Sequence, residues 1–194
     1  MQADTINQTN PFIRAYYMDP KVCDGIMSVI QHDPDTFDGL RENYQGYRNR
    51  FLEWMPEEVK RPYYNSLWNI MEQYKQEFEH CYLQLGMWTL RHGVRVQHYP
   101  PGYHYSGYHC ENEGRPDTNI MHLVFMTYLN DVDQGGGTEF LYQGLQTRPE
   151  KGLTLVWPAE WTHTHRGIVA PAEDKYITTG WFVFDNTQGS REYV

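Results

Sequence analysis

The sequence predicts an α+β fold in which two helices pack on one side of an antiparallel β-sandwich or barrel. Apolar residues recur at helical spacing only in the first half of the chain. From Val94 onward, short segments rich in β-branched and aromatic residues alternate with clusters of turn residues. Helices followed by a run of short strands are typical of two packed layers around one core.

The length and composition indicate one compact unit. The chain has 194 residues, 40% of them hydrophobic, which is enough to bury a core without disulfides or a structural metal. We therefore expect a single domain over residues 1–194. Within it, 1–93 would form a helical support region, 94–184 a β core that carries the functional site, and 185–194 a tail.

The first expected helix is marked by its own start signal. Residues 1–10 are polar and are expected to be loose, and the alternation over 12–18 predicts a strand. Asp19 and Pro20 then supply an N-cap and a first-turn proline for a helix that continues to about residue 31.

A second, longer helix is expected after a loop over 33–51. It begins near Pro56, carries two acidic residues in its first turn, and continues to about Leu83. From there the apolar period changes to that of strands. The expected strands are 94–99, 122–129, 138–142, 153–157, 162–169 and 176–184.

Charge and cysteine content exclude several function classes. A net charge of −9 provides no basic surface for a phosphate backbone, so no nucleic-acid partner is expected. Cys23, Cys81 and Cys110 form no CxxC pair, which favours a reducing compartment. The polar N-terminus and the absence of a long apolar stretch predict a cytoplasmic protein without a membrane segment.

His109 and Glu111 form a candidate pair of metal ligands. In an extended segment, residues two apart project to the same side, so both side chains could reach one ion. Two histidines and one carboxylate on one face are the common ligand set for a mononuclear iron(II) that activates oxygen. By itself the triplet is weak, because a chain with nine His and 25 acidic residues produces about one such spacing by chance.

More specific signals surround this pair in a fixed order. A second histidine, His165, is followed ten residues later by Lys175 and an aromatic residue. The sequence resembles the Fe(II)/2-oxoglutarate-dependent oxygenase superfamily, and within it the prolyl 4-hydroxylase-like branch, over roughly residues 95–184. The matching elements are Tyr99-Pro100-Pro101-Gly102, His109-Cys110-Glu111, Tyr128-Leu129-Asn130, Gly136-Gly137-Thr138-Glu139-Phe140, His165 and Lys175-Tyr176.

The resemblance implies a fold, a metal site and a reaction. The fold would be a double-stranded β-helix, or jelly-roll, barrel with the N-terminal helices packed on one sheet. His109, Glu111 and His165 would be the catalytic Fe(II) ligands, with 2-oxoglutarate and O2 as cosubstrates and ascorbate as a further candidate cofactor. The enzyme would hydroxylate a C–H bond, in the first instance of a prolyl residue in a peptide or protein, and release succinate and CO2.

The same resemblance assigns residues around the cosubstrate and the substrate. Lys175 would bind the far carboxylate of 2-oxoglutarate, because a buried lysine usually has an anion as partner. Tyr128 matches the family's hydroxyl partner for that carboxylate, and Thr179 lies four residues beyond Lys175 on the same strand face. Tyr99 is expected to line the cofactor pocket by family position. Arg166 and Trp181 are candidate substrate-pocket residues, with a surface arginine and a core tryptophan as the alternatives.

Two choices within the site stay open at this point. His163 and His165 are two apart, so on one strand both would face the same side; the ten-residue offset to Lys175 selects His165. Glu111 departs from the aspartate that most family members use, yet it remains an oxygen ligand and argues against a halogenase.

Alternatives for the function also remain. The substrate could be a free amino acid or another small molecule, and the chain could be a cupin-like metal-binding module without 2-oxoglutarate turnover. A cupin-like barrel gives no reason for a lysine ten residues past the last ligand. The sequence leaves the oligomeric state open.

Overall fold

The computed structural model describes residues 2–33, 46–83 and 87–185. In this part of the chain, one antiparallel sheet of seven strands faces a smaller antiparallel sheet of three. The larger sheet has the order β1-β8-β5-β10-β4-β2, with β3 also paired to β10; the smaller sheet has the order β7-β6-β9. The predicted α+β class is therefore confirmed.

The helices and strands have the following bounds. The helices are α1 (Gln2–Thr9), α2 (Pro20–His32) and α3 (Glu57–Glu77), with 3-10 turns η2 (Leu52–Trp54), η3 (Glu79–Cys81) and η4 (Trp161–His163). The strands are β1 (Arg14–Tyr17), β2 (Arg48–Phe51), β3 (Trp88–Leu90), β4 (Arg95–Tyr99), β5 (Met121–Tyr128), β6 (Thr138–Phe140), β7 (Leu145–Gln146), β8 (Leu153–Pro158), β9 (His165–Gly167) and β10 (Lys175–Phe184).

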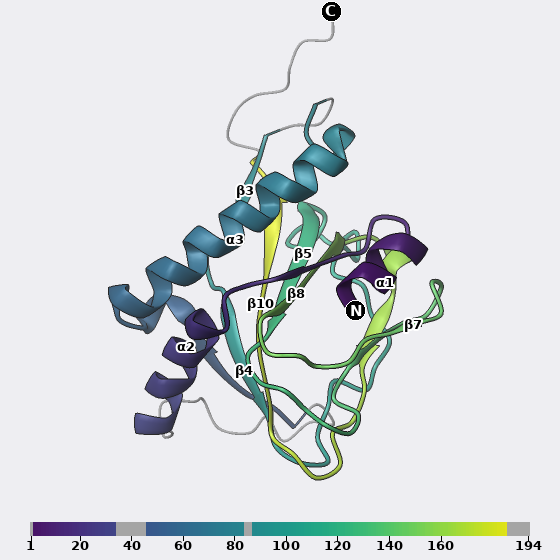
Figure 1. Ribbon diagram of the computed structural model, residues 1–194. Coiled ribbons are helices and arrows are strands. Elements are labelled where there is room, and N and C mark those ends of the chain that lie inside the picture. The colour runs from purple at the N-terminus through teal and green to yellow at the C-terminus, as the bar shows by residue number, and fades with distance from the viewer. Residues whose placement is uncertain (1, 34–45, 84–86, 186–194) are drawn as a thin grey trace, which may run out of the picture.

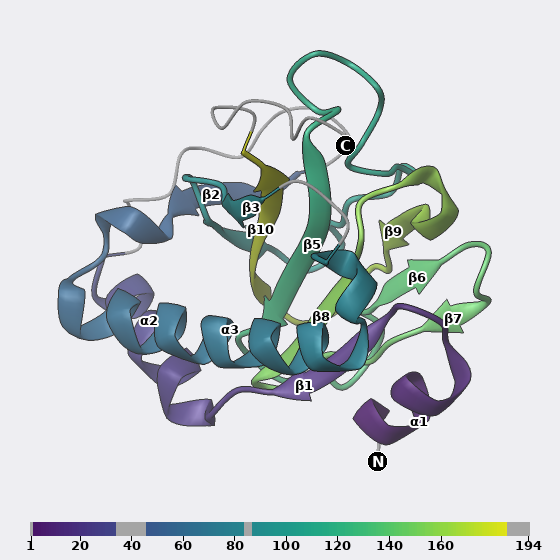
Figure 2. The same ribbon diagram turned by 90° about the horizontal axis from the view of Figure 1, so that it is seen from above.

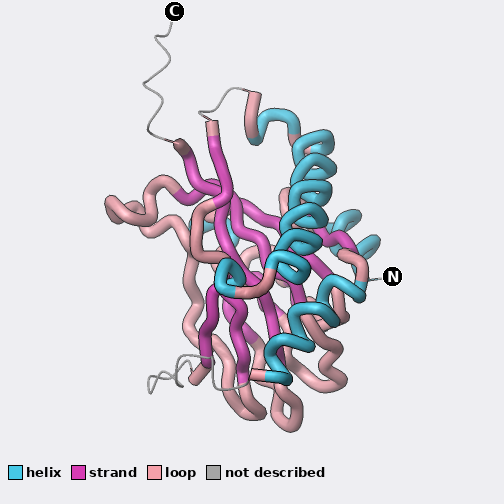
Figure 3. Tube along the Cα trace, turned by 90° about the vertical axis from the view of Figure 1, so that its left-hand side faces the viewer, coloured by secondary structure: helices cyan, strands magenta, loops and turns pink. Residues whose placement is uncertain are grey.

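Helices α2 and α3 cover one face of the larger sheet, and the smaller sheet lies on the other side (Figures 1 and 2). The tube view shows the helices gathered on one side of the strands (Figure 3). The Asp19 side chain caps α2 by accepting a hydrogen bond from the backbone N–H of Lys21 at 2.9 Å, as the sequence predicts.

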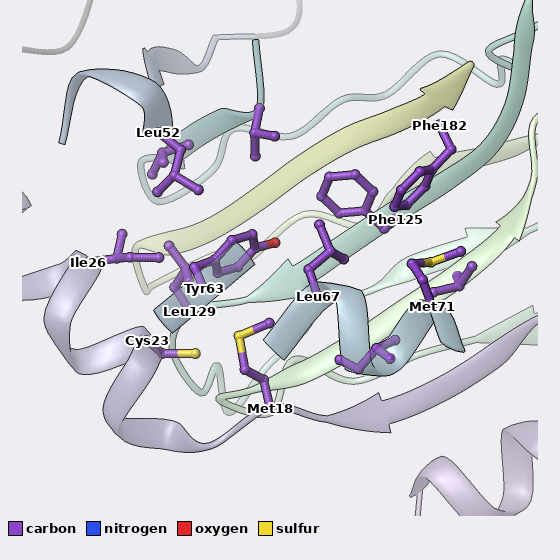
Figure 4. Packing of buried hydrophobic residues seen from close by; sticks show 14 of the residues in the cluster. Met18, Cys23, Ile26, Leu52, Tyr63, Leu67, Met71, Phe125, Leu129 and Phe182 are labelled. Carbon is purple, nitrogen blue, oxygen red and sulfur yellow. The ribbon is translucent and has the colours of Figure 1, made fainter. Parts of the chain in front are cut away.

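The core between helices and sheet is apolar and continuous. Ile26 of α2, Leu67 of α3, Phe125 of β5 and Phe182 of β10 belong to one buried cluster, with Leu67 beside Phe125 and Ile26 at the other end near Tyr63 (Figure 4). Burying a side chain of this size contributes about 1.5–3 kcal/mol. Because strand residues alternate, the neighbouring Met126 points to the opposite face and belongs to a second cluster inside the barrel.

A buried polar contact links α3 to the centre of the larger sheet. The hydroxyl of fully buried Tyr63 lies 2.5 Å from Thr178 Oγ1 on β10 and 3.2 Å from Thr127 Oγ1 on β5. A buried hydroxyl needs such partners, since an unsatisfied one costs about 1–3 kcal/mol. The helix is thereby fixed over the strands that carry the site on their other face.

The expectation that residues 1–10 are loose was wrong. Residues 2–9 form α1, whose Ala3 and Ile6 are buried. The Asn7 side chain accepts from the N–H of Ala15 and donates to its carbonyl, and the Gln2 amide makes the same pair with Arg148. Asn7 and Ala15 are eight residues apart, but Gln2 and Arg148 are 146 apart, so local periodicity does not indicate the helix.

The expectation of a continuous loop over 33–51 was also wrong at its end, where Arg48–Phe51 pairs with β4 as strand β2. Residues 34–45 and 84–86 lie outside the described part of the chain, as do residues 186–194 of the expected tail at 185–194. Helix α3 ends at Glu77, earlier than expected, because the backbone of Phe78 leaves the helical conformation (φ −124°, ψ 67°) and the chain continues into the 3-10 turn η3. Strands β3 and β7 are too short to predict from alternation.

The segment 162–169, expected to be one strand, divides into two elements. Residues 161–163 form the turn η4, and only His165–Gly167 pair as β9. His163 and His165 therefore do not share a strand face, which removes the reason for treating them as equivalent.

Candidate metal centre and its pocket

Three side chains converge between the two sheets. His109 and Glu111 lie on an extended segment before β5, and His165 is the first residue of β9. The backbones of His109 and His165 exchange N–H to carbonyl hydrogen bonds of 3.0 and 2.9 Å, which holds the two segments together. One ligand atom from each of the three residues lies within 4.8 Å of the others, which is compatible with a shared ion.

The two imidazoles are oriented for metal binding. Nδ1 of His109 lies 3.0 Å from the Gly107 carbonyl, and Nδ1 of His165 lies 3.0 Å from the His163 carbonyl. A carbonyl can only accept, so each Nδ1 carries the proton and each Nε2 keeps a lone pair. These Nε2 atoms face Glu111 Oε1 at 3.5 and 3.8 Å. A ligating histidine usually has such a carbonyl partner on its other nitrogen.

The protonation states also suit a cation. Burial, and secondarily the neighbouring His109, lowers the pKa of His165 to about 4, so its imidazole is neutral at pH 7. Burial alone would raise the pKa of Glu111, but hydrogen bonding to the His109 ring and the electrostatic influence of the His165 ring outweigh it, and the net pKa is lowered. The donor set of two imidazoles and one carboxylate thus fits Fe(II).

A cavity of about 270 Å³ adjoins the three residues. Its wall is formed by inward-facing residues of β4, β5, β8 and β10 on one side and of β6 and β9 on the other. This volume is close to the lower end for small-molecule sites. Its described lining contains three cations, Arg95, Arg166 and Lys175, and one carboxylate, that of Glu111.

Lys175 is a buried cation without a counter-ion. Its side chain is 4% exposed, and its ammonium lies 4.5 Å from the centre of the Tyr99 ring. Among the described residues no carboxylate or hydrogen-bond acceptor pairs with it, and burial lowers its pKa to about 8. A charged group held in this way needs an anion, which a ligand carboxylate would provide.

The other predicted cofactor residues are placed in two layers. Tyr99 and Thr179 line the cavity with Lys175. The Tyr99 hydroxyl donates to Gln97 Oε1 at 2.9 Å, and the Thr179 hydroxyl donates to the Phe125 carbonyl at 3.2 Å.

Tyr128 lies behind this wall. It is fully buried, does not line the cavity, and its hydroxyl lies 3.0 Å from Thr138 Oγ1 and 2.8 Å from Thr147 Oγ1. Thr138, which does line the cavity, is the intermediate between Tyr128 and the site.

Both predicted substrate-pocket residues line the cavity. Arg166 Nε donates to Glu139 Oε2 at 2.6 Å, and the guanidinium lies 4.4 Å from the centre of the Tyr108 ring. The Trp181 indole N–H lies near the Glu111 carboxylate and contributes to lowering its pKa. His163, by contrast, faces Phe12 and pairs with the Thr162 hydroxyl, so it points away from the centre.

Several lining residues were not predicted from the sequence. Arg95 and Gln97 share the inward face of β4 with Tyr99, so strand alternation could have identified them. Tyr105 packs with its ring 4.2 Å from that of His109, and Trp157 lies 5.1 Å from His165. No local signal distinguishes these two aromatic residues from ordinary core residues.

Comparison with known proteins gives one family and a consistent fold. Residues 94–183 match the sequence model of the 2OG-Fe(II) oxygenase superfamily. A search of curated protein sequences gave no match.

Three solved structures illustrate the likeness. The viral collagen prolyl hydroxylase vCPH from Paramecium Bursaria Chlorella virus-1, in a 2OG complex, has a TM-score of 0.69 at 18% identity over 91% of this chain and 98% of its own. A Pseudomonas putida prolyl-4-hydroxylase has a TM-score of 0.68 at 18% identity over 96% of this chain and 100% of its own. The Trichoplax adhaerens prolyl hydroxylase, in complex with a hypoxia inducible factor peptide fragment, has a TM-score of 0.65 at 14% identity over 95% and 88%. At these identities the likeness establishes the jelly-roll fold.

Proposed function

Because residues 94–183 of this chain belong to the 2OG-Fe(II) oxygenase superfamily, we propose that His109, Glu111 and His165 bind the Fe(II) of a 2-oxoglutarate-dependent dioxygenase. The reaction is hydroxylation of a C–H bond, with a prolyl residue of a peptide or protein as the proposed target. Succinate and CO2 are the coproducts.

One observation supports this proposal above all others. The three ligand atoms lie within 4.8 Å of one another, and the unpaired cation Lys175 lines the same cavity. A cupin-like metal module without a diacid cosubstrate would have no use for a buried lysine that lacks a counter-ion. The pairing of the two features therefore favours an iron enzyme that also binds a dicarboxylate.

The residues have distinct roles in the proposed mechanism. Fe(II) and 2-oxoglutarate together would supply the redox chemistry that inserts one oxygen atom of O2 into the C–H bond and one into succinate. Lys175 binds the far carboxylate, and Tyr99 forms the apolar floor beneath its ammonium. Thr179 adds a polar group to the same wall, while Tyr128 holds Thr138 in place. The aromatic walls exclude water and position the substrate, which limits oxidation without a substrate.

The prolyl target is supported by the shared fold of three prolyl hydroxylases, which is an analogy of fold and not of site. A free amino acid or small acid is the second candidate, and the unpaired Arg95 in the cavity favours it. Ascorbate is proposed as an accessory reductant.

The proposed setting is a single-domain protein of the cytoplasm. Three free cysteines in the described chain are compatible with a reducing compartment. Within the described residues, no helix combines the length and apolar composition of a membrane span.

Anaerobic titration with Fe(II) and 2-oxoglutarate tests the proposal. The wild-type protein is expected to develop the weak visible charge-transfer band of the chelate and to form succinate under O2. His165→Ala is expected to lose both, whereas the matched variant His163→Ala is expected to keep both, because His163 points away from the centre. Unchanged 2-oxoglutarate turnover in His165→Ala would contradict the site assignment.

A further inference from the structure

A second unpaired cation, Arg95, lies in the cavity beside the proposed metal centre. It is on the inward face of β4, and its guanidinium lies 5.1 Å from the centre of the Trp181 ring. Its Nε is buried and has no hydrogen-bond partner, and no carboxylate among the described residues forms an ion pair with it. Arginine has a rigid set of hydrogen-bond donors suited to carboxylates. A buried Nε without an acceptor can therefore donate to a carboxylate of a ligand.

Arg95 lies away from the proposed 2-oxoglutarate anchor. In the pairing of β4 with β10, Tyr99 lies opposite Lys175 and Arg95 lies opposite Thr179. These positions are four residues apart, or about 13 Å along the strand. The two carboxylate carbons of 2-oxoglutarate are only four bonds apart, about 5 Å. The guanidinium also lies over the ring of Trp181, two positions beyond Thr179 on β10, so the backbone positions place the two cations at different parts of the cavity.

The charges around the cavity leave Arg95 unbalanced. Arg166 forms an ion pair with Glu139 at 2.6 Å, and Glu139 does not line the cavity. Fe(II) and the 2-oxoglutarate dianion cancel one another, and Lys175 offsets Glu111. One positive charge then remains, although the whole chain has a net charge of −9. A charge in a confined, partly buried site is stable only when an anion balances it.

We propose that Arg95 binds a carboxylate of the primary substrate, which is therefore an acid and not a neutral internal segment of a peptide. The proposal rests on the proposed function, because Lys175 must be occupied by 2-oxoglutarate for Arg95 to be the remaining cation. The carboxylate can be that of a free imino or amino acid, of a chain that ends in the target residue, or of an acidic side chain beside it.

Trp181 completes this subsite. Its indole is buried, lies under the guanidinium, and is close to Glu111. A substrate carboxylate on Arg95 would thus place the adjoining carbons beside the proposed metal ligands. Arg95 and Trp181 together would determine which acid is accepted and which carbon faces the centre.

Binding to a protein that cannot turn over tests the proposal directly. The Zn(II)-substituted protein, saturated with 2-oxoglutarate, is titrated by calorimetry with three matched pairs of probes. They are L-proline and L-prolinamide, acetyl-Ala-Pro with a free and an amidated C-terminus, and amidated peptides containing Pro-Glu or Pro-Gln. At least one acid is expected to bind about tenfold or more tightly than its amide partner. The pair that shows the difference identifies the source of the carboxylate.

Two variants assign the effect to Arg95. Arg95→Gln is expected to abolish the preference for the acid, and Arg95→Lys to retain part of it. Arg91→Gln is the matched control, because Arg91 lies 5.9 Å from the Trp181 ring but does not line the cavity; it is expected to leave the preference unchanged. Affinity for 2-oxoglutarate, measured from the Fe(II) chelate band, is expected to be the same in all of these proteins.

Several results would overturn the proposal. They are equal binding of acid and amide in every pair, absence of binding by all three acids, or a preference that survives Arg95→Gln. Weaker binding of 2-oxoglutarate in Arg95→Gln would assign Arg95 to the cosubstrate instead. If the chelate band itself does not form, the proposed function fails; if it forms normally and the acids show no preference, only this proposal fails.

Discussion

The buried ammonium of Lys175 is energetically unfavourable as long as no anion is bound beside it. Its usual pKa of 10.5 falls to about 8 because burial disfavours the charged ammonium, and no neighbouring charge among the described residues opposes that effect. A shift of this size corresponds to about 3 kcal/mol between the two protonation states. Burial of the Lys175 ammonium therefore lowers the stability of the folded protein, and an anionic ligand bound beside it would offset this cost.

Replacing Lys175 with Met is expected to separate binding from stability. The variant should bind 2-oxoglutarate about 10–100-fold more weakly, because hydrogen bonds to charged groups contribute about 1.5–3 kcal/mol. Its free energy of unfolding at pH 7 should not fall, since the buried charge is removed. Anaerobic chelate titration and urea denaturation measure the two quantities. Loss of stability without loss of affinity would contradict the assigned role.

The same residue predicts the pH dependence of cosubstrate binding. Above pH 8 the ammonium is increasingly neutral, so the affinity for 2-oxoglutarate should fall, by about tenfold per pH unit once pH exceeds the pKa. Tyr99, the nearest titratable neighbour, stays protonated because burial holds its pKa well above 10.

Stability should change in the opposite direction in that range. Between pH 8 and 10.5 the folded state binds fewer protons at Lys175 than the unfolded state does, so this group stabilises the fold as pH rises. Chelate titrations and denaturant midpoints from pH 7 to 9.5 test both trends. Lys175→Met is the control, and its profile should lack both contributions.

At the scale of elements, β10 organises the site and the core together. Its inward residues Lys175, Thr179 and Trp181 line the cavity, while Thr178 and Phe182 face the helices. β10 is also paired with β3, β4 and β5, so it is central in the larger sheet. A substitution that shifts β10 on its helix-facing side should therefore also move the residues of β10 that line the cavity.

Gly180→Ala is expected to disturb β10 from its helix-facing side. A Cβ at this position would lie 2.4 Å from Phe125 Cζ, so the ring must move. Overpacking of this kind costs about 1–3 kcal/mol. Thermal denaturation should show a lower midpoint, and affinity for 2-oxoglutarate should fall because Thr179 and Trp181 shift with the strand.

Gly25→Ala in α2 is the matched control for that substitution. A Cβ there meets nothing within 4 Å, and alanine favours a helix interior by about 0.5–1 kcal/mol over glycine. The midpoint should rise slightly with no change at the site. Equal effects of the two substitutions would show that contact with Phe125 is not the cause.

At the scale of the whole molecule, the two apolar clusters share the larger sheet. One lies between that sheet and α2 and α3, and the other fills the barrel interior. Adjacent residues of β5, such as Phe125 and Met126, belong to different clusters. If either cluster lost its packing, one face of the larger sheet would be exposed to water. The other cluster packs on the opposite face of the same sheet and would be destabilised as well.

The protein is therefore expected to unfold in one cooperative transition. Far-UV and near-UV circular dichroism should give coincident urea curves, and saturating 2-oxoglutarate with Zn(II) should shift both curves together. A fragment comprising residues 94–185 should fail to give a cooperative curve, because its strands would expose Phe125 and Phe182. Two separate transitions would instead indicate two domains.

Local patterns predicted the elements whose signals lie within a few residues. The Asp19 cap, the apolar face of α3 and the alternation in β5 and β10 are all of this kind, and the structure contains each of them. The resemblance, carried by the order of motifs from Tyr99 to Lys175, predicted the family and the jelly-roll fold, which are confirmed. The roles of the individual site residues remain predictions.

Other features depend on partners far away in the chain. Helix α1 is held in place by Arg148, 146 residues from Gln2, as well as by the nearby Ala15, and η4 turns His163 toward Phe12 instead of the centre. The sequence could not show that Tyr128 lies behind Thr138, because that depends on how two sheets face one another.

The sequence by itself determined the candidate ligands and the lysine, through the order of motifs that carries the family resemblance; spacing along a strand added which side chains share a face. Only the tertiary structure decided which of them share a cavity, and that Arg95 faces that cavity without an ion-pair partner among the described residues. The physical reason is that the charge balance around a side chain depends on every segment that folds around it. The spacing of residues in the sequence describes only one segment at a time, so it cannot show whether a counter-ion lies nearby.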